Sequence, residues 1–315
     1  MAIEEVKITD AASGSSATIL VGWGFNCYQF TAVVEGKPIE VLWANPKFSS
    51  GEGRPSGNGI PLLFPYPGRL GGTTLEYEGK TYELEGNDGR GNAIHGFCMT
   101  RPWEVVEKTA SRIVGRFHAS KVDPEILKRW PADFILTVSY ELAGATLASE
   151  ITIENPDDKP LPFGLGTHPY FRLPLGPEGS RDDCRVTVPV KSYFELVDML
   201  PTGKKLPAVE GRGLAAGMRF ADTKLDDVFT DVEFSQGAAA ATITDPTNRR
   251  KLTVAFDSGF PHVVVYNPPH REAICIEPYS CVPDQFAMTK KGVVKAPQTL
   301  APGAKISYRY EMRVE

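Results

Sequence analysis

Histidine and acidic side chains that could transfer protons occur where three unusual segments interrupt the rest of the chain. The first, 57–95, begins GNGIPLLFPYPGRL and later reads NAIHGF, the second, 163–171, reads FGLGTHPYF, and the third, 275–280, reads CIEPYS. An imidazole titrates close to neutral pH and a glutamate is ionised there, so His168 and Glu277 could supply an acid and a base. Catalytic groups are commonly brought together from distant strands, so their separation along the chain is no obstacle.

Each of these side chains also has a structural interpretation. Alternation along an extended strand puts Glu277 on the opposite face from Ile274 and Ile276, where its carboxylate could be a salt-bridge partner instead of a base. His168 could be a hydrogen-bonded core histidine, and His95 could brace a loop. The residue types alone therefore leave both interpretations open.

Alternation of apolar and polar residues with a period of two, the pattern of half-buried strands, runs through most of the chain. It is clearest in 145–154, where Ala145, Leu147, Ile151 and Ile153 fall on one face, and in 306–314, where every second residue is apolar. Clusters rich in Gly, Pro and Asn, such as NPDDKP and GPEGS, separate the strand candidates. The other predicted strands are 6–9, 17–21, 28–34, 39–44, 112–118, 134–141, 185–190, 240–244, 252–256, 262–266 and 273–277.

Helical signal is scarce. The best candidate is 123–130, where Asp123 can cap the helix, Pro124 suits its first position and Glu125 complements its dipole. Many strands with few helices and no repeat spacing predict an all-β fold of packed antiparallel sheets. Because all-β units reach about 250 residues, we expect 1–315 to form one domain.

Composition excludes several classes of function. A net charge of -5 and a pI near 5.7 leave no basic field for nucleic acid. The start, MAIEEVKITD, is acidic where a signal peptide is basic, and no apolar run approaches a membrane span, so we expect a cytoplasmic protein without a membrane partner. The five cysteines are odd in number and include no CxxC pair, which predicts reduced, buried thiols.

In chain order, these segments resemble the aldose 1-epimerase, or galactose mutarotase, family. The series is an IPxLFPxxGR-like stretch, a later HG, a THPYF, an LDDxF and a late EP, all between positions 57 and 278. A single HG or EP carries no information, but five motifs in this order are specific. The resemblance implies a large antiparallel β-supersandwich with few short helices, which agrees with the strand pattern.

The resemblance also implies a role for each site residue. His168 would be the general acid at a sugar's ring oxygen, and Glu277 the general base at its anomeric hydroxyl. His95 would hold or polarise the ring, while Arg69 and Asp226 would bind substrate hydroxyls. The implied activity is that of an isomerase that interconverts the α and β anomers of a hexose. Since neither redox chemistry nor group transfer takes place, we expect no cofactor and no metal.

Two details refine this assignment. The commonest form of the motif has Asn-Arg where this chain has Gly68-Arg69, a loss of hydrogen-bonding capacity that bears on the preferred sugar more than on the reaction. Because Asp226 and Asp227 are adjacent, only one can point into a pocket from a strand. The motif favours Asp226, so we expect Asp227 to be solvated or to cap a turn.

The preferred substrate has an alternative, a hexose 6-phosphate. Enzymes that epimerise such sugars need basic residues for the phosphate, and Arg54, Arg90 and Arg101 lie near the first motifs. Aromatic residues near the motifs are mostly expected in the core, although any could stack on a sugar ring. They are Tyr66, Phe97, Trp103, Tyr170, Phe171 and Tyr279.

Three other classes of function remain open at this stage. A glycoside hydrolase needs two carboxylates, which Glu277 and Asp226 could supply. A metal enzyme could use His95, His168 and Glu277, although no HxH or HExxH spacing supports it. A carbohydrate-binding protein could keep the pocket without turnover. The remaining histidines, which lack motif context and are expected in structural or surface roles, are His118, His262 and His270.

Overall fold

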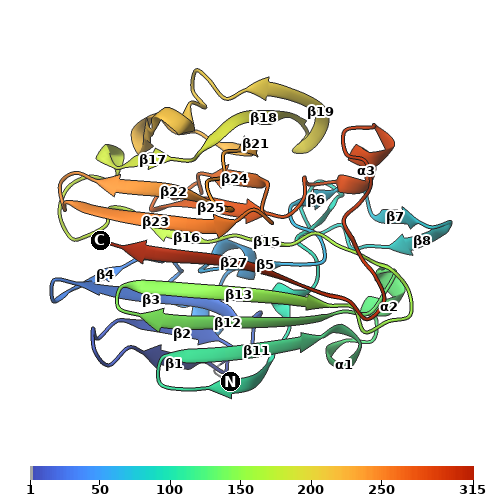
Figure 1. Cartoon of the computed structure of the whole chain (residues 1–315), viewed down its shortest axis with the longest axis horizontal. Coiled ribbons are helices and arrows are strands. Elements are labelled where there is room, and N and C mark those ends of the chain that lie inside the picture. Colours follow the sequence, from blue (N-terminus) through green and yellow to red (C-terminus); the bar gives the residue numbers. More distant parts are fainter. Residues whose placement is uncertain (1–2) are drawn as a thin grey trace.

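Two large antiparallel sheets dominate this computed structural model, which describes residues 3–315 (Figure 1). The longest apolar–polar alternations fall in the larger sheet, which has nine strands. In spatial order these are β10 (Glu104–Lys108), β11 (Arg112–His118), β12 (Ile135–Ala143), β13 (Thr146–Glu154), β27 (Lys305–Val314), β23 (Arg250–Asp257), β22 (Ala238–Asp245), β17 (Arg185–Thr187) and β20 (Met218–Arg219).

The second sheet has eight strands and includes at least one strand from each of the three motif segments. Its order is β19 (Leu200–Pro207), β18 (Val190–Val197), β21 (Asp226–Val232), β24 (His262–Tyr266), β25 (Ala273–Tyr279), β15 (Gly166–Thr167) and β5 (Leu62–Leu63), and β16 (Tyr170–Arg172) also pairs with β25. Smaller sheets are formed by β1 (Val6–Thr9), β2 (Ser16–Leu20), β3 (Asn26–Val34) and β4 (Lys37–Glu40), and by the pairs β6 (Arg69–Leu70) with β9 (Ala93–Ile94), β7 (Thr74–Tyr77) with β8 (Lys80–Glu83), and β14 (Leu161–Pro162) with β26 (Thr299–Leu300).

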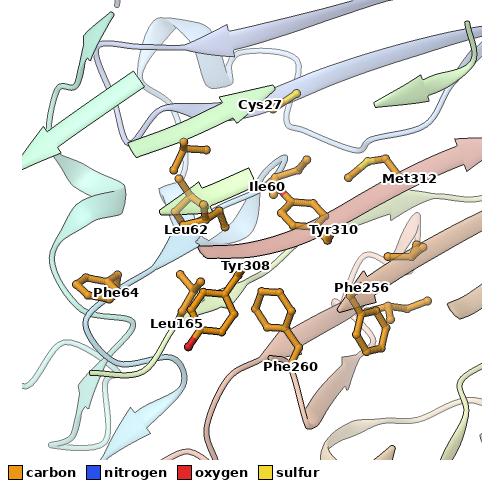
Figure 2. Close-up of a cluster of buried hydrophobic side chains, with 14 of the residues drawn as sticks. Cys27, Ile60, Leu62, Phe64, Leu165, Phe256, Phe260, Tyr308, Tyr310 and Met312 are labelled. Atoms are coloured by element: carbon orange, nitrogen blue, oxygen red, sulfur yellow. The ribbon is translucent and has the colours of Figure 1, made fainter. Parts of the chain in front are cut away.

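The main hydrophobic core joins residues of both large sheets. From Tyr308 to Val314 every second residue of β27 is buried, and Figure 2 shows Tyr308, Tyr310 and Met312 in one cluster with Leu62 of β5 and the nearby Leu165. Each fully buried apolar side chain of this size contributes about 1.5–3 kcal/mol. The alternation in the sequence therefore identifies the face of a strand that packs in the core. The predicted all-β fold of antiparallel sheets is confirmed.

Most predicted strands are present, and 112–118 and 262–266 have the bounds expected of them. Among the strands of four or more residues, the sequence did not predict β7, β8, β10, β18, β19 or β21. In β18 half-buried residues follow one another, because this strand pairs close to an edge of its sheet. Period-two alternation therefore fails there as a signal.

The helix predicted at 123–130 is wrong in its bounds. The chain forms α1 (Ala119–Val122) and α2 (Ile126–Arg129), and Asp123 lies between them in an extended conformation. Its carboxylate accepts a hydrogen bond from the Glu125 amide and binds Arg101, so 123–126 forms a tight turn instead of a first helical turn.

A further helix, α3 (Gln285–Lys290), was not predicted. Short 3-10 segments complete the structure, and no helix within 3–315 combines the length and apolar character needed to cross a bilayer. The 3-10 segments are Phe48–Ser50, Pro55–Gly57, Cys98–Thr100, Arg181–Asp183, Leu214–Ala216 and Phe220–Asp222.

Candidate active site

In the eight-stranded sheet, residues paired across neighbouring strands form rows that run perpendicular to the strands. Two such rows point to the same face of the sheet. Strand register places Asp226 opposite Tyr266, Tyr266 opposite Cys275, and Cys275 opposite Tyr170. Residues directly opposite each other in antiparallel strands point to the same side. Asp226, on β21, and the aromatic residues of β24 and β16 therefore share a face.

The next row, two residues further along β25, contains Glu277. Val264 lies opposite both Glu277 and Val228, so this row runs across β21, β24 and β25. The intervening residues Ile274 and Ile276 belong to the main core on the other face. The alternation predicted for 273–277 is thus realised, and it puts Glu277 on the same face as Asp226.

His168 and Glu277 meet on this face. His168 follows β15, its amide donates to Pro61 O at 3.0 Å, and its ring stacks on Tyr170 with centroids 4.8 Å apart and planes 4° from parallel. His168 Nε2 lies 3.3 Å from Glu277 Oε1, and Tyr279 donates its hydroxyl hydrogen to Glu277 Oε2 at 2.8 Å. Both members of the pair are buried, so their geometry is fixed by packing.

Burial opposes a net charge on either group alone. It raises the pKa of Glu277 well above its usual value, an effect that the Tyr279 hydrogen bond counteracts and the nearby Asp226 increases. Burial likewise lowers the pKa of His168 to about 3. One proton shared between the two side chains avoids net charge in the low dielectric. In either arrangement one group is then a proton donor and the other an acceptor.

His95 lies beside this pair in a strained turn. It has a φ of 66°, its amide donates to Gly68 O at 2.9 Å, and its Nδ1 accepts from Gly68 N at 3.3 Å. Burial lowers the pKa of His95 well below its usual value, and the charge of Arg69 acts in the same direction. A neutral ring whose Nδ1 accepts carries its hydrogen on Nε2, so His95 is a donor at that atom. Its ring contacts that of His168 edge-on, with centroids 5.7 Å apart.

Arg69 is held by a carboxylate that sequence reasoning missed. Asp88 Oδ2 accepts from Arg69 Nε at 3.0 Å, while the Asp88 side chain, 0% exposed, also accepts from Asn92 Nδ2 and from the amides of Arg90 and Asn92. Although burial raises it, these donors together hold the pKa of Asp88 well below its usual value. The only sequence signal was the turn-rich stretch NDGRGN between two motifs.

A cavity of about 410 Å³ opens over these groups. The five residues predicted to form the site, Arg69, His95, His168, Asp226 and Glu277, all line it. Desolvation raises the pKa of Asp226, and the positive charge of Arg69 opposes this shift. A set of apolar residues also lines the cavity, namely Met99, Leu196, Met199, Val228 and Val264.

Two expectations about charged neighbours are wrong. Asp227 is neither solvated nor a turn cap, because it points away from the cavity and its buried carboxylate accepts from Arg212 Nε at 2.9 Å. Arg101 lies outside the cavity lining and binds Asp123 and Phe97 O instead. Of the three arginines considered for a phosphate, Arg54 lines the cavity.

The aromatic residues near the motifs divide between the cavity lining and the main core. Tyr170 and Tyr279 line the cavity, together with Tyr266, which the sequence did not single out. Those of the main core are Tyr66, Phe97, Trp103 and Phe171. The other histidines lie outside the lining: His118 binds Asp133, His262 packs near Phe194, and His270 stacks on Trp43.

Metal-ligating side chains come together in a set that differs from the one considered above. Within residues 3–315, His168, Cys275 and Glu277 each offer one ligand atom, and these atoms lie within 4.8 Å of one another. Cys275 is thus the third member of this set, in place of His95, which the sequence suggested. Burial raises the pKa of the Cys275 thiol well above its usual value, which opposes the thiolate that metals prefer.

Known proteins share this arrangement of sheets. The chain is similar to a galactose mutarotase-like protein from Clostridium acetobutylicum, with a TM-score of 0.84 and 21% identity over 100% of this chain and 99% of that one. The maltose epimerase of Levilactobacillus brevis is 24% identical over 94% of this chain and 92% of its own length. Protein YihR of Escherichia coli K12, itself uncharacterised, is 27% identical over 71% and 70%. A family model described as aldose 1-epimerase matches residues 12–313, and the chain therefore belongs to the aldose 1-epimerase family.

Proposed function

We propose that the protein interconverts the α and β anomers of a hexose, with Glu277 and His168 as its catalytic pair. The observation that carries the proposal is the 3.3 Å approach of His168 Nε2 to Glu277 Oε1 at the wall of a cavity. Opening a hemiacetal requires a base at the anomeric hydroxyl and an acid at the ring oxygen. A buried pair that shares one proton meets both needs.

The reaction follows from these two positions. Glu277 removes the proton of the anomeric hydroxyl while His168 delivers one to the ring oxygen, and the bond between C1 and the ring oxygen breaks. Rotation about the C1–C2 bond of the open aldehyde exposes its opposite face. Reclosure with the two roles reversed yields the other anomer and restores the shared proton.

The remaining polar groups bind and orient the sugar. His95 donates through Nε2 from a rigid turn, so it is suited to hold an oxygen of the ring. Arg69 supplies a fixed donor because Asp88 holds its Nε. Asp226 accepts hydrogen bonds from hydroxyls at the solvent-exposed end of its row. Donors and acceptors that line one cavity suit a polyhydroxylated ligand.

One assay tests the reaction. The approach to anomeric equilibrium of freshly dissolved α-glucose and α-galactose is followed by polarimetry, with and without protein. We expect acceleration by the wild-type protein and not by Glu277→Gln. Acceleration of neither sugar, nor of glucose 6-phosphate by NMR exchange, would contradict the proposal. Release of aglycone from a panel of glycosides would indicate a hydrolase, and sugar binding without acceleration would indicate a binding protein.

A hexose 6-phosphate is a second candidate substrate. Arg54 lines the cavity, and within residues 3–315 its guanidinium has no carboxylate partner. A free guanidinium at a cavity edge can bind a phosphate in bidentate fashion. If the phosphosugar is the substrate, Arg54→Gln raises KM for glucose 6-phosphate and leaves KM for glucose unchanged. Arg219→Gln, at a paired surface arginine, is the matched control.

A further inference from the structure

The loop between β18 and β19 has an unusual residue at its tip. Val197 pairs with Leu200, so Asp198 and Met199 form a two-residue turn, and their φ values are 50° and 67°. Turns with both central residues at positive φ favour Asn-Gly, because a side chain in the left-handed region costs about 1–2 kcal/mol. Met199 therefore occupies a position that glycine would fill without strain.

Met199 belongs to the wall of the cavity. It lines the cavity together with Leu196, which precedes the turn, and with Met99, Val228 and Val264. The last three belong to a hydrophobic cluster separate from the main core, and Leu196 packs against this cluster. Met199 thus extends an apolar wall that faces the proton-transfer pair and its polar neighbours.

Packing of β19 against its neighbours holds the hairpin in this place. The Leu200 side chain lies next to Gly71, two residues after Arg69, where an added Cβ would be 3.4 Å from Leu200 Cδ1. In β19, an added Cβ on Gly203 would be 2.6 Å from Val293 Cγ2, so the strand packs tightly against the segment that follows α3. The hairpin, at the edge of the eight-stranded sheet (Figure 1), is therefore held through β19, the strand that follows its tip.

We propose that Met199 determines substrate specificity, a proposal that rests on the proposed function. Strain retained where glycine would relieve it indicates a functional constraint. A thioether is apolar, flexible and without a hydrogen to donate, so it contacts the C–H surface of a sugar and adapts to it. Met199 also occupies volume at the tip, and it therefore limits the size of the substituent that a sugar can carry on this side.

Kinetics of Met199→Gly and of the matched control Asp198→Gly test the proposal. Both variants remove a left-handed side chain from the same turn, so we expect neither to lower Tm. Met199→Gly should raise KM for glucose and raise the ratio of kcat/KM for maltose over glucose by about tenfold. Asp198→Gly should leave KM and the ratio unchanged. A Met199→Gly variant with a lower Tm, or with the wild-type ratio, overturns the proposal.

A second measurement does not depend on turnover. Protein labelled with ¹³C at its methionine methyl groups is titrated with glucose and with maltose, and resonances are assigned by substitution. We expect the Met199 methyl signal to shift while that of Met312, buried in the main core, stays in place. An unmoved Met199 signal overturns the proposal. If no sugar is mutarotated, the proposed function fails, and this titration alone decides whether Met199 contacts sugar.

Discussion

Glu277 and His168 are polar side chains at positions where packing would favour apolar ones. The sequence identified both because motif order and strand alternation pointed to the same residues, and the structure brings them to 3.3 Å. Asp88 escaped notice because a carboxylate in a turn-rich stretch normally caps its own loop, and nothing local shows that it also reaches Arg69. Asp227 was misjudged for the same reason, since its partner Arg212 belongs to no motif.

Loss of the Glu277 carboxyl group should abolish most of the activity. Glu277→Gln keeps the side-chain volume and removes the base, so the mutarotation rate should fall by about 10² or more. Polarimetry with freshly dissolved α-anomer measures it, and Glu233→Gln, at an exposed residue paired with Lys191, is the control. Full activity of a folded Glu277→Gln protein would exclude the assigned role.

Asp88 should act on the substrate through Arg69. Arg69→Ala should mainly raise KM, if the arginine binds substrate and transition state equally. Asp88→Asn removes the charge that holds the guanidinium and should raise KM in the same direction. In a double-mutant cycle, Asp88→Asn should add little in the Arg69→Ala background. Additive effects of the two substitutions would show that Asp88 acts independently of Arg69.

The depressed pKa of Asp88 also predicts a pH dependence of stability. A carboxyl whose pKa is lower in the folded than in the unfolded protein stabilises the fold above its ordinary pKa of 3.8, and this contribution is lost as pH falls further. The difference in unfolding free energy between wild type and Asp88→Asn should therefore shrink as pH falls below 3.8. Urea titrations over acidic pH measure this difference, and a constant value would contradict the prediction.

Elements with clean alternation were predicted, and those determined by tertiary contacts were not. Strand β27 alternates because one of its faces meets the core, whereas the edge hairpin of β18 and β19 is half-buried on both faces. The helix near Asp123 failed because Arg101, distant in sequence, competes for its cap. Sequence propensity is a weak prior where such contacts decide the conformation.

The HG motif at 95–96 has a backbone cause that can be tested. Gly96 has a φ of 69°, and an added Cβ would lie 2.0 Å from Phe64 O. Gly96→Ala should therefore cost more stability than the roughly 1–2 kcal/mol of left-handed strain alone. Gly144→Ala, at a φ of 60° with nothing within 4 Å, isolates that strain. Equal midpoints of urea unfolding for the two variants would refute the close approach.

At the scale of the whole molecule, the all-β prediction held because burial on one face of a sheet imposes a period of two on most of the long strands. The structure also shows that the nine-stranded and eight-stranded sheets contribute to one core. No local sequence pattern encodes this pairing of sheets. The assignment of 1–315 to a single domain, the cytoplasmic location and the absence of a cofactor stay predictions. The preferred sugar also depends on side chains such as Met199 that belong to no motif.

All five cysteines of the chain are buried and free of disulfides. Alkylating reagents and fluorescent maleimides need an accessible thiolate, so the native protein should react with them slowly. A single cysteine introduced at the exposed Val197, beside the hairpin tip, would then be the preferred labelling position. A dye attached there could follow ligand entry into the cavity in real time, without removal of any native thiol.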